Sequence, residues 1–265
     1  MRAPAPHWPE YAIEGTCLGL FMVSAAAFAT LLQHPASPLA AWQPGALLQR
    51  VLMGIAMGVT AMALVYSPLG RRSGAHMNPA VTLAFLRLGK VAPRDAVGYI
   101  AAQFVGGSAG IVVATLLLRG MPSDSSVNYV ATLPGTGGWA TAFAAELVIS
   151  FVLMAVLLRL SNMPRTARFT GIAAGLLVTL YIIVEAPLSG MSMNPARTLG
   201  SNVLADAPGS LWIYFTAPPL GMLLAAELFI RRRGQSWIRC AKLHHTVGVR
   251  CIFRCGYGPV PTEIA

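Results

Sequence analysis

Charged residues are scarce in this sequence, where they make up 11% of the 265 positions. Soluble domains usually carry about 25% charged residues, and their exterior must tolerate water. The shortage therefore argues against a soluble enzyme, a disordered chain and a nucleic-acid-binding protein. Cysteine is also scarce, because Cys17, Cys240, Cys251 and Cys255 are the only four. They are too few and too clustered for a secreted disulfide framework.

Long apolar runs are what the sequence has instead, with 55% hydrophobic residues and a mean hydropathy of +0.63. A helix needs about 20 apolar residues to cross a bilayer. Two apolar pieces, 79–88 and 195–203, are too short to span, and each begins with proline, which suits the first turn of a helix. The six stretches expected to span are 11–32, 46–66, 96–118, 139–160, 169–184 and 211–230.

The basic residues are distributed unevenly between the gaps. With the N-terminus inside, 16 of the 19 lysines and arginines fall on the cytoplasmic side, and Arg50, Arg119 and Arg197 fall outside. Cytoplasmic loops carry the basic excess in membrane proteins. We therefore expect a multi-pass protein of the cell membrane, in a bacterial inner membrane, with both termini cytoplasmic. A cleaved signal peptide is disfavoured, because Glu10 and Glu14 stand at the beginning of the first apolar run.

A segment of twelve residues occurs twice. Residues 73–84 and 189–200 are identical at eight of twelve positions, and each follows the second span of its half. Each half also has a glutamate in its first span, Glu14 or Glu146. Three spans per half is an odd number, so the second half enters the membrane inverted. Such an inverted repeat places the functional site near the middle of the membrane.

Each copy contains Asn-Pro-Ala, which predicts the start of a helix, since Asn is a preferred N-cap and Pro a preferred first residue. Two half-helices entering from opposite faces would meet with their positive dipole ends at the centre. There the loop carbonyls can accept hydrogen bonds from water in single file, and the asparagine amides can donate to it. Ordinary helix caps are the alternative interpretation. The motif residues are Asn78, Pro79, Ala80, Asn194, Pro195 and Ala196.

These features resemble the aquaporin, or major intrinsic protein, family over about residues 10–233. The resemblance implies an all-α membrane protein with six transmembrane helices plus two half-helices in an inverted repeat. It also implies a bacterial-type homotetramer with one pore per subunit, in which Glu14 and Glu146 hold the half-helix loops. The expected organisation is a cytoplasmic N-terminus (1–10), a channel domain (11–233, with half-repeats 11–118 and 139–233) and a cytoplasmic basic tail (234–265).

The family has a second constriction, a filter built from four positions. Alignment on the second motif makes Arg197 the filter arginine, which offers planar donors to a passing oxygen. Water-selective members commonly have a histidine in the fifth span and an aromatic residue in the second, and this sequence has neither. The filter is therefore expected to be more apolar. Its positions are Arg197, Met191 in the loop, Ile182 in the fifth span, and Met57 or Gly58 in the second.

The combined features predict a passive channel for water with leak of small neutral solutes, which excludes protons and ions. No catalytic centre and no cofactor are expected in the pore. Thr198, Tyr214 and Phe215 differ from the residues of the glycerol-conducting branch and favour water. A channel for glycerol or other small uncharged solutes is the alternative, ahead of an alternating-access transporter or a structural membrane protein. The alternative interpretation of Arg197 is a salt bridge with Glu185.

The tail contains Cys240, His244, His245, Cys251 and Cys255. Their two i, i+4 pairs are compatible with a site for a soft metal such as zinc, which takes four ligands. Disulfides are disfavoured on the reducing cytoplasmic side. The alternative is a basic segment lying on the anionic lipid of the bilayer, with an acylated cysteine.

Overall fold

The computed structural model describes residues 5–39, 42, 45–205 and 207–257, and in that part of the chain every regular element is a helix. Six helices are long and apolar enough to cross a membrane. They are α1 (Trp8–Gln33), α2 (Ala46–Tyr66), α5 (Pro93–Leu117), α6 (Gly138–Ser161), α7 (Thr170–Val184) and α10 (Leu211–Arg233). The short helices are α3 (Pro68–Ser73), α4 (Pro79–Arg87), α8 (Ala186–Ser189) and α9 (Pro195–Asn202).

The predicted all-α fold is confirmed, and all six spans begin and end within three residues of the expected positions. The differences arise because a helix continues past its apolar stretch. Helix α5 begins at Pro93, with proline in its first turn, and α10 continues through three exposed arginines to Arg233. The fifth span remains short, since α7 ends at Val184 and the chain turns before α8.

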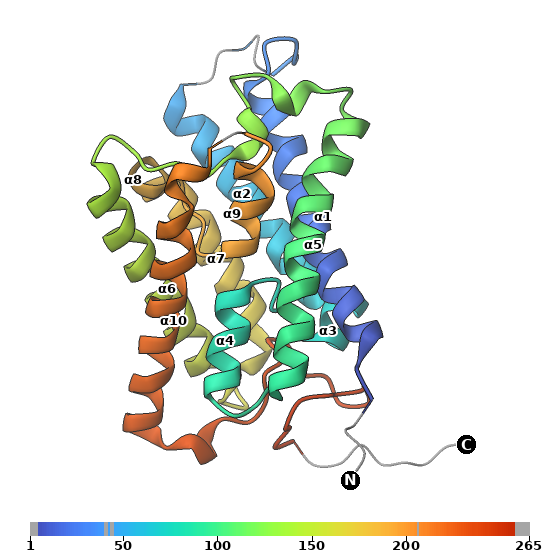
Figure 1. Cartoon of the computed structure of the whole chain (residues 1–265). Helices are drawn as coiled ribbons and strands as arrows, with labels where there is room; N and C mark the ends of the chain where they lie inside the picture. The colour runs from blue at the N-terminus through green and yellow to red at the C-terminus, as the bar shows by residue number, and fades with distance from the viewer. Residues whose placement is uncertain (1–4, 40–41, 43–44, 206, 258–265) are drawn as a thin grey trace.

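The two half-helices, α4 and α9, lie end to end along the middle of the bundle (Figure 1). The start of α1 and residues 234–257 lie at one end of the bundle, which we call the tail side; the opposite end is the far side. Helix α4 lies in the tail-side half and α9 in the far-side half. Helix α1 packs on α5, α6 on α10 and α2 on α7. The inverted arrangement expected from the repeat is thus the one observed.

Glycines allow the long helices to approach closely. A Cβ atom on Gly106 of α5 would lie 2.0 Å from the carbonyl oxygen of Gly15 on α1. A Cβ on Gly58 of α2 would lie 2.0 Å from Thr179 Oγ1 and 2.6 Å from the Gly175 oxygen on α7. Small residues of this kind are typical of helix contacts in membranes. Gly58 is therefore a packing residue between α2 and α7.

The outer surface of the bundle is apolar. On α5 alone, Val105 is 70% exposed, Leu116 74% and Leu117 70%. Soluble monomers rarely expose contiguous apolar patches of this kind. Together with six apolar spans, this surface is that of a multi-pass membrane protein.

Candidate functional site

The two asparagines of the repeated motif cap the half-helices and also bind the opposite loop. Asn78 Oδ1 accepts from Ala80 N at 2.8 Å, and Asn194 Oδ1 accepts from Ala196 N at 3.0 Å. Asn78 Nδ2 donates to Met193 O and Asn194 Nδ2 donates to Met77 O, both at 2.7 Å. Each amide carries two hydrogens, so one remains for another acceptor. The caps were predicted from sequence; the reciprocal bonds between the loops were not.

Glu14 collects the donors of the first loop. Its carboxylate accepts from Ser73 Oγ at 2.8 Å, His76 N at 3.0 Å and Met77 N at 2.7 Å. Gln103 Nε2 of α5 adds a fourth bond at 3.0 Å. A fully buried carboxylate is costly unless donors surround it. Here those donors include two backbone N–H groups, so the glutamate fixes the path of the loop.

Glu146 does the same for the second loop. It accepts from Ser189 Oγ at 2.9 Å, Ser192 N at 2.6 Å and Met193 N at 2.7 Å. Like Glu14, it has 0% of its surface exposed. Charge-assisted bonds to a carboxylate are about twice as strong as neutral ones. The two halves of the chain therefore use equivalent residues to shape their loops.

The loops contain residues in left-handed backbone conformations that neither Ala nor Met prefers. Ala75 and Met77 have φ of 56° and 49°, and Met191 and Met193 have φ of 51° and 55°. A non-glycine residue at positive φ is uncommon and costs energy. The bonds to Glu14 and Glu146 offset that cost. The sequence offers no sign of this conformation, because residue type alone gives no reason for it.

A cavity of about 470 Å³ crosses the bundle beside the meeting point of the half-helices. Its lining begins on the far side with Gln33 and Gln49, includes Asn78 and Asn194, and reaches Leu243 on the tail side. Both loops contribute to the wall. Polar groups thus line the middle of a path that is otherwise mostly apolar.

The structure brings most of the filter candidates to the far-side part of this cavity. Met57, Ile182, Met191 and Arg197 all line it. Gly58 does not, because it is covered by α7. Of the two residues considered for the second span, Met57 is therefore the one that contacts the cavity.

Arg197 makes no ion pair with Glu185, so that alternative interpretation is wrong within the described part of the chain. Glu185 Oε1 instead lies 2.5 Å from Ser189 Oγ. Arg197 Nη1 is buried and has no hydrogen-bond partner among the described residues. Buried donors are normally satisfied. A guanidinium left with a free donor beside a cavity is suited to bind an oxygen atom within that cavity.

Four of the five candidate metal ligands in the tail also come together. One ligand atom from each of Cys240, His245, Cys251 and Cys255 lies within 4.8 Å of the other three. His244 is elsewhere, with its ring edge against Tyr66 at a centroid distance of 4.9 Å. Sequence spacing did not distinguish the two histidines, since they are adjacent.

Sequence reasoning missed two further residues of the pore region. His76 Nε2 lies 2.9 Å from Ala241 O, which links the first loop to the tail. Leu243 of the tail lines the cavity. Neither contact has a sequence signal, because each joins segments more than 160 residues apart.

The sequence profile of the family described as Major intrinsic protein matches residues 12–229. Aquaporin NIP1-2 of Arabidopsis thaliana is 38% identical over 186 residues, which cover 67% of this chain and 62% of that protein. Aquaporin NIP3-1 of the same plant is 37% identical over 181 residues, 66% of this chain and 55% of that protein. The chain thus spans less than two thirds of these relatives. The expectation of a bacterial-type member is not borne out by them.

A solved structure of the aquaglyceroporin from Plasmodium falciparum has the same fold. Its TM-score is 0.68, and the match covers 83% of this chain and 94% of that one. The two sequences are 21% identical. At this sequence identity, the likeness shows that the two proteins share a fold, and it does not indicate which solute this chain conducts.

Proposed function

This chain belongs to the major intrinsic protein family, and we propose that it conducts water together with uncharged solutes of about glycerol size. As in the aquaporins it resembles, its role is that of a channel and not of an enzyme. The observation that carries the choice of solute is the cavity wall, which Met57, Ile182 and Met191 line together with Arg197. Apolar walls suit the CH groups of a polyol, and the guanidinium suits its hydroxyls.

The residues that favoured strict water conduction do not contact the cavity. Tyr214 donates its hydroxyl hydrogen bond to Ser189 O at 2.5 Å, and Thr198 hydrogen-bonds Ser192. Neither residue lines the cavity, nor does Phe215. Tyr214 and Thr198 therefore act on the second loop and Phe215 stacks on Phe104 of α5, whereas the apolar residues Met57, Ile182 and Met191 line the cavity. This supports conduction of small polyols beside water.

The same geometry supports exclusion of ions. The N-termini of α4 and α9 place partial positive charge at the centre of the path, and Arg197 adds a full charge near the far side. A water oxygen that accepts from Asn78 and Asn194 has no lone pair left for a neighbouring water. The chain of proton transfer is interrupted at that point. Cations meet repulsion at two successive positions.

Flux through proteoliposomes tests the solute range. The unmodified protein should raise both osmotic water flux and glycerol uptake above empty vesicles. Ile182→His is expected to lower glycerol uptake by about tenfold while changing water flux by less than about twofold, because a polar side chain in a narrow pocket discriminates at this level. Ile182→Leu is the matched control and should retain both. Equal losses of both fluxes, or an unmodified protein closed to glycerol, would contradict the proposal.

We also propose a homotetramer in a cell membrane with the tail side in the cytoplasm, as the basic residues indicate. Ser125, in the far-side loop, and Ser236, at the start of the tail, are both exposed. On intact cells, an impermeant thiol reagent should label Ser125→Cys but not Ser236→Cys or the unmodified protein. Ser236→Cys should react only after permeabilisation. The reverse pattern would invert the topology.

A further inference from the structure

The tail, residues 234–257, has a short 3-10 turn (Gln235–Trp237) as its only helix within the described chain and folds back across the tail side of the bundle. Cys240 Sγ lies 3.6 Å from Cys251 Sγ, and Cys255 Sγ lies 3.2 Å from His245 Nε2. In a tetrahedral zinc site, Zn–S bonds of about 2.3 Å separate two sulfurs by about 3.8 Å. The four side chains are therefore spaced as zinc ligands are, with little movement needed.

The donor set suits zinc chemically. Zinc binds thiolate sulfur and neutral imidazole nitrogen, so three cysteines and one histidine form a complete set of four ligands. Cys240 is buried, whereas His245, Cys251 and Cys255 are partly exposed. Solvent can therefore take up the protons that the thiols lose when a metal binds.

We propose that these four side chains bind one Zn²⁺ ion, which holds the tail across the tail-side mouth of the pore. The site takes a soft divalent cation, because three of its donors are sulfur. Binding displaces the protons of the three thiols to solvent. His244, packed on Tyr66, is not a ligand.

The residues between the first two ligands contact the pore loop. Ala241 O lies 2.9 Å from His76 Nε2, and Leu243 N donates to Gly74 O at 3.1 Å. Leu243 also lines the cavity. A metal that joins Cys240 to His245 closes a short loop around these residues. It therefore restricts Leu243 to the mouth.

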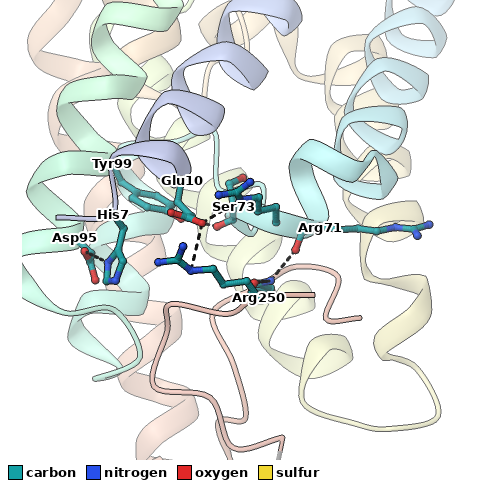
Figure 2. Close-up of polar contacts among 9 residues, drawn as sticks. His7, Glu10, Arg71, Ser73, Asp95, Tyr99 and Arg250 are labelled. Carbon is teal, nitrogen blue, oxygen red and sulfur yellow. Dashed lines mark hydrogen bonds and ion pairs between the residues drawn. The ribbon is translucent and has the colours of Figure 1, made fainter. Parts of the chain in front are cut away.

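Further contacts tie the tail to the bundle. Lys242 Nζ, on a side chain whose residue is 2% exposed, donates to Arg71 O at 2.7 Å and Arg250 O at 2.6 Å. Figure 2 shows Arg250 directed toward Glu10 of α1, with Arg250 Nε 3.8 Å from the carboxylate. Glu10 is fully buried and also pairs with Arg72. Ordering a segment without regular structure costs a large amount of conformational entropy. A metal that joins residues 240, 245, 251 and 255 would offset part of that cost.

Metal content tests the site directly. The full-length protein, purified in detergent, loaded with Zn²⁺ and freed of excess, should contain about one zinc per chain. The adjacent histidines form a matched pair: His245→Gln should lose most of the zinc, and His244→Gln should keep it. Cys251→Ser should behave as His245→Gln does, and Cys17→Ser as the unmodified protein does.

Loading with Co²⁺ gives a second measurement of the same site. The unmodified protein and His244→Gln should show the visible bands of tetrahedral cobalt bound by thiolate, and His245→Gln should not. Equal zinc in both histidine variants, no zinc in the unmodified protein, or a disulfide between Cys240 and Cys251 after rapid thiol blocking would each overturn the site.

The effect on the mouth rests on the proposed function and is measured separately. Arg250 and Arg254 are exposed but lie in a tail of fixed conformation. Removing zinc with a chelator should release the tail and thereby speed trypsin cleavage after these two residues. It should also raise water flux by about twofold or more, because the mouth widens when Leu243 leaves. Leu243→Ala should show high flux with or without zinc. Unchanged trypsin sensitivity and flux in zinc-binding protein would overturn the role of the metal in holding the tail. No flux in either state would instead count against the proposed function, and leave the zinc content as evidence for the site.

Discussion

Replacing Glu146 by Gln is expected to lower the water flux of the reconstituted protein by about tenfold or more, since buried donors left unsatisfied cost about 1–3 kcal/mol each. Glu146 accepts from Ser189 Oγ and from the N–H groups of Ser192 and Met193. A glutamine presents an NH₂ group where one carboxylate oxygen accepted. Donor would then face donor, and the left-handed turn at Met193 would lose its support.

Flux per chain is the quantity to measure, with the amount of protein in the vesicles determined for each variant. Glu227→Gln provides the control, because Glu227 lies near the surface of α10 and pairs with Arg87 at 2.5 Å and Arg231 at 3.2 Å. Such exposed pairs contribute about 0–1 kcal/mol. That control should conduct like the unmodified protein. A fully conducting Glu146→Gln channel would show that the carboxylate does not hold the loop.

Replacing Arg197 by Val is expected to raise uptake of a five-carbon polyol by about tenfold or more, a difference that pocket size alone can produce. The change removes the bulkiest side chain of the proposed filter and leaves Met57, Ile182 and Met191 as apolar lining of the cavity. It also removes the full positive charge beside the path. An imposed pH gradient should then decay faster than with the unmodified protein.

Polyol uptake and the decay of a pH gradient can be followed in the same vesicles. Arg197→Lys keeps the charge but loses the planar guanidinium. It should therefore retain the pH gradient while changing solute uptake, which separates charge from size. If Arg197→Val takes up the same solutes as the unmodified protein and lets the pH gradient decay at the same rate, the filter lies elsewhere in the cavity.

The spans and the helix starts could be predicted because they depend on local sequence. An apolar run of bilayer length specifies a helix, and Asn before Pro specifies its first turn at Asn78 and Asn194. The duplicated segment predicted the relation between the halves, and the resemblance to the family gave the expectation that Glu14 and Glu146 hold the half-helix loops. Each of these signals is contained within a few neighbouring residues.

Which of Met57 and Gly58 contacts the cavity could not be chosen from sequence, because the two differ by one position and therefore by about 100° around a helix of 3.6 residues per turn. The packing of Gly58 against α7 leaves Met57 as the one that lines the cavity. The docking of Leu243 and the choice of His245 over His244 are likewise set by contacts between distant segments. The positive φ values at Met77 and Met193 follow from the glutamate bonds rather than from residue preference.

The tail lies at one mouth of a path whose centre is built from two equivalent halves. Thermodynamics limits what an obstruction on one side of such a path can do to the flux. An obstruction in a passive pathway lowers inward and outward permeability by the same factor, because every trajectory can be traversed in reverse. Leu243 at the tail-side mouth therefore cannot make a solute accumulate against its gradient. It can instead make the rate at which a solute equilibrates across the membrane depend on the composition of the solution on the tail side.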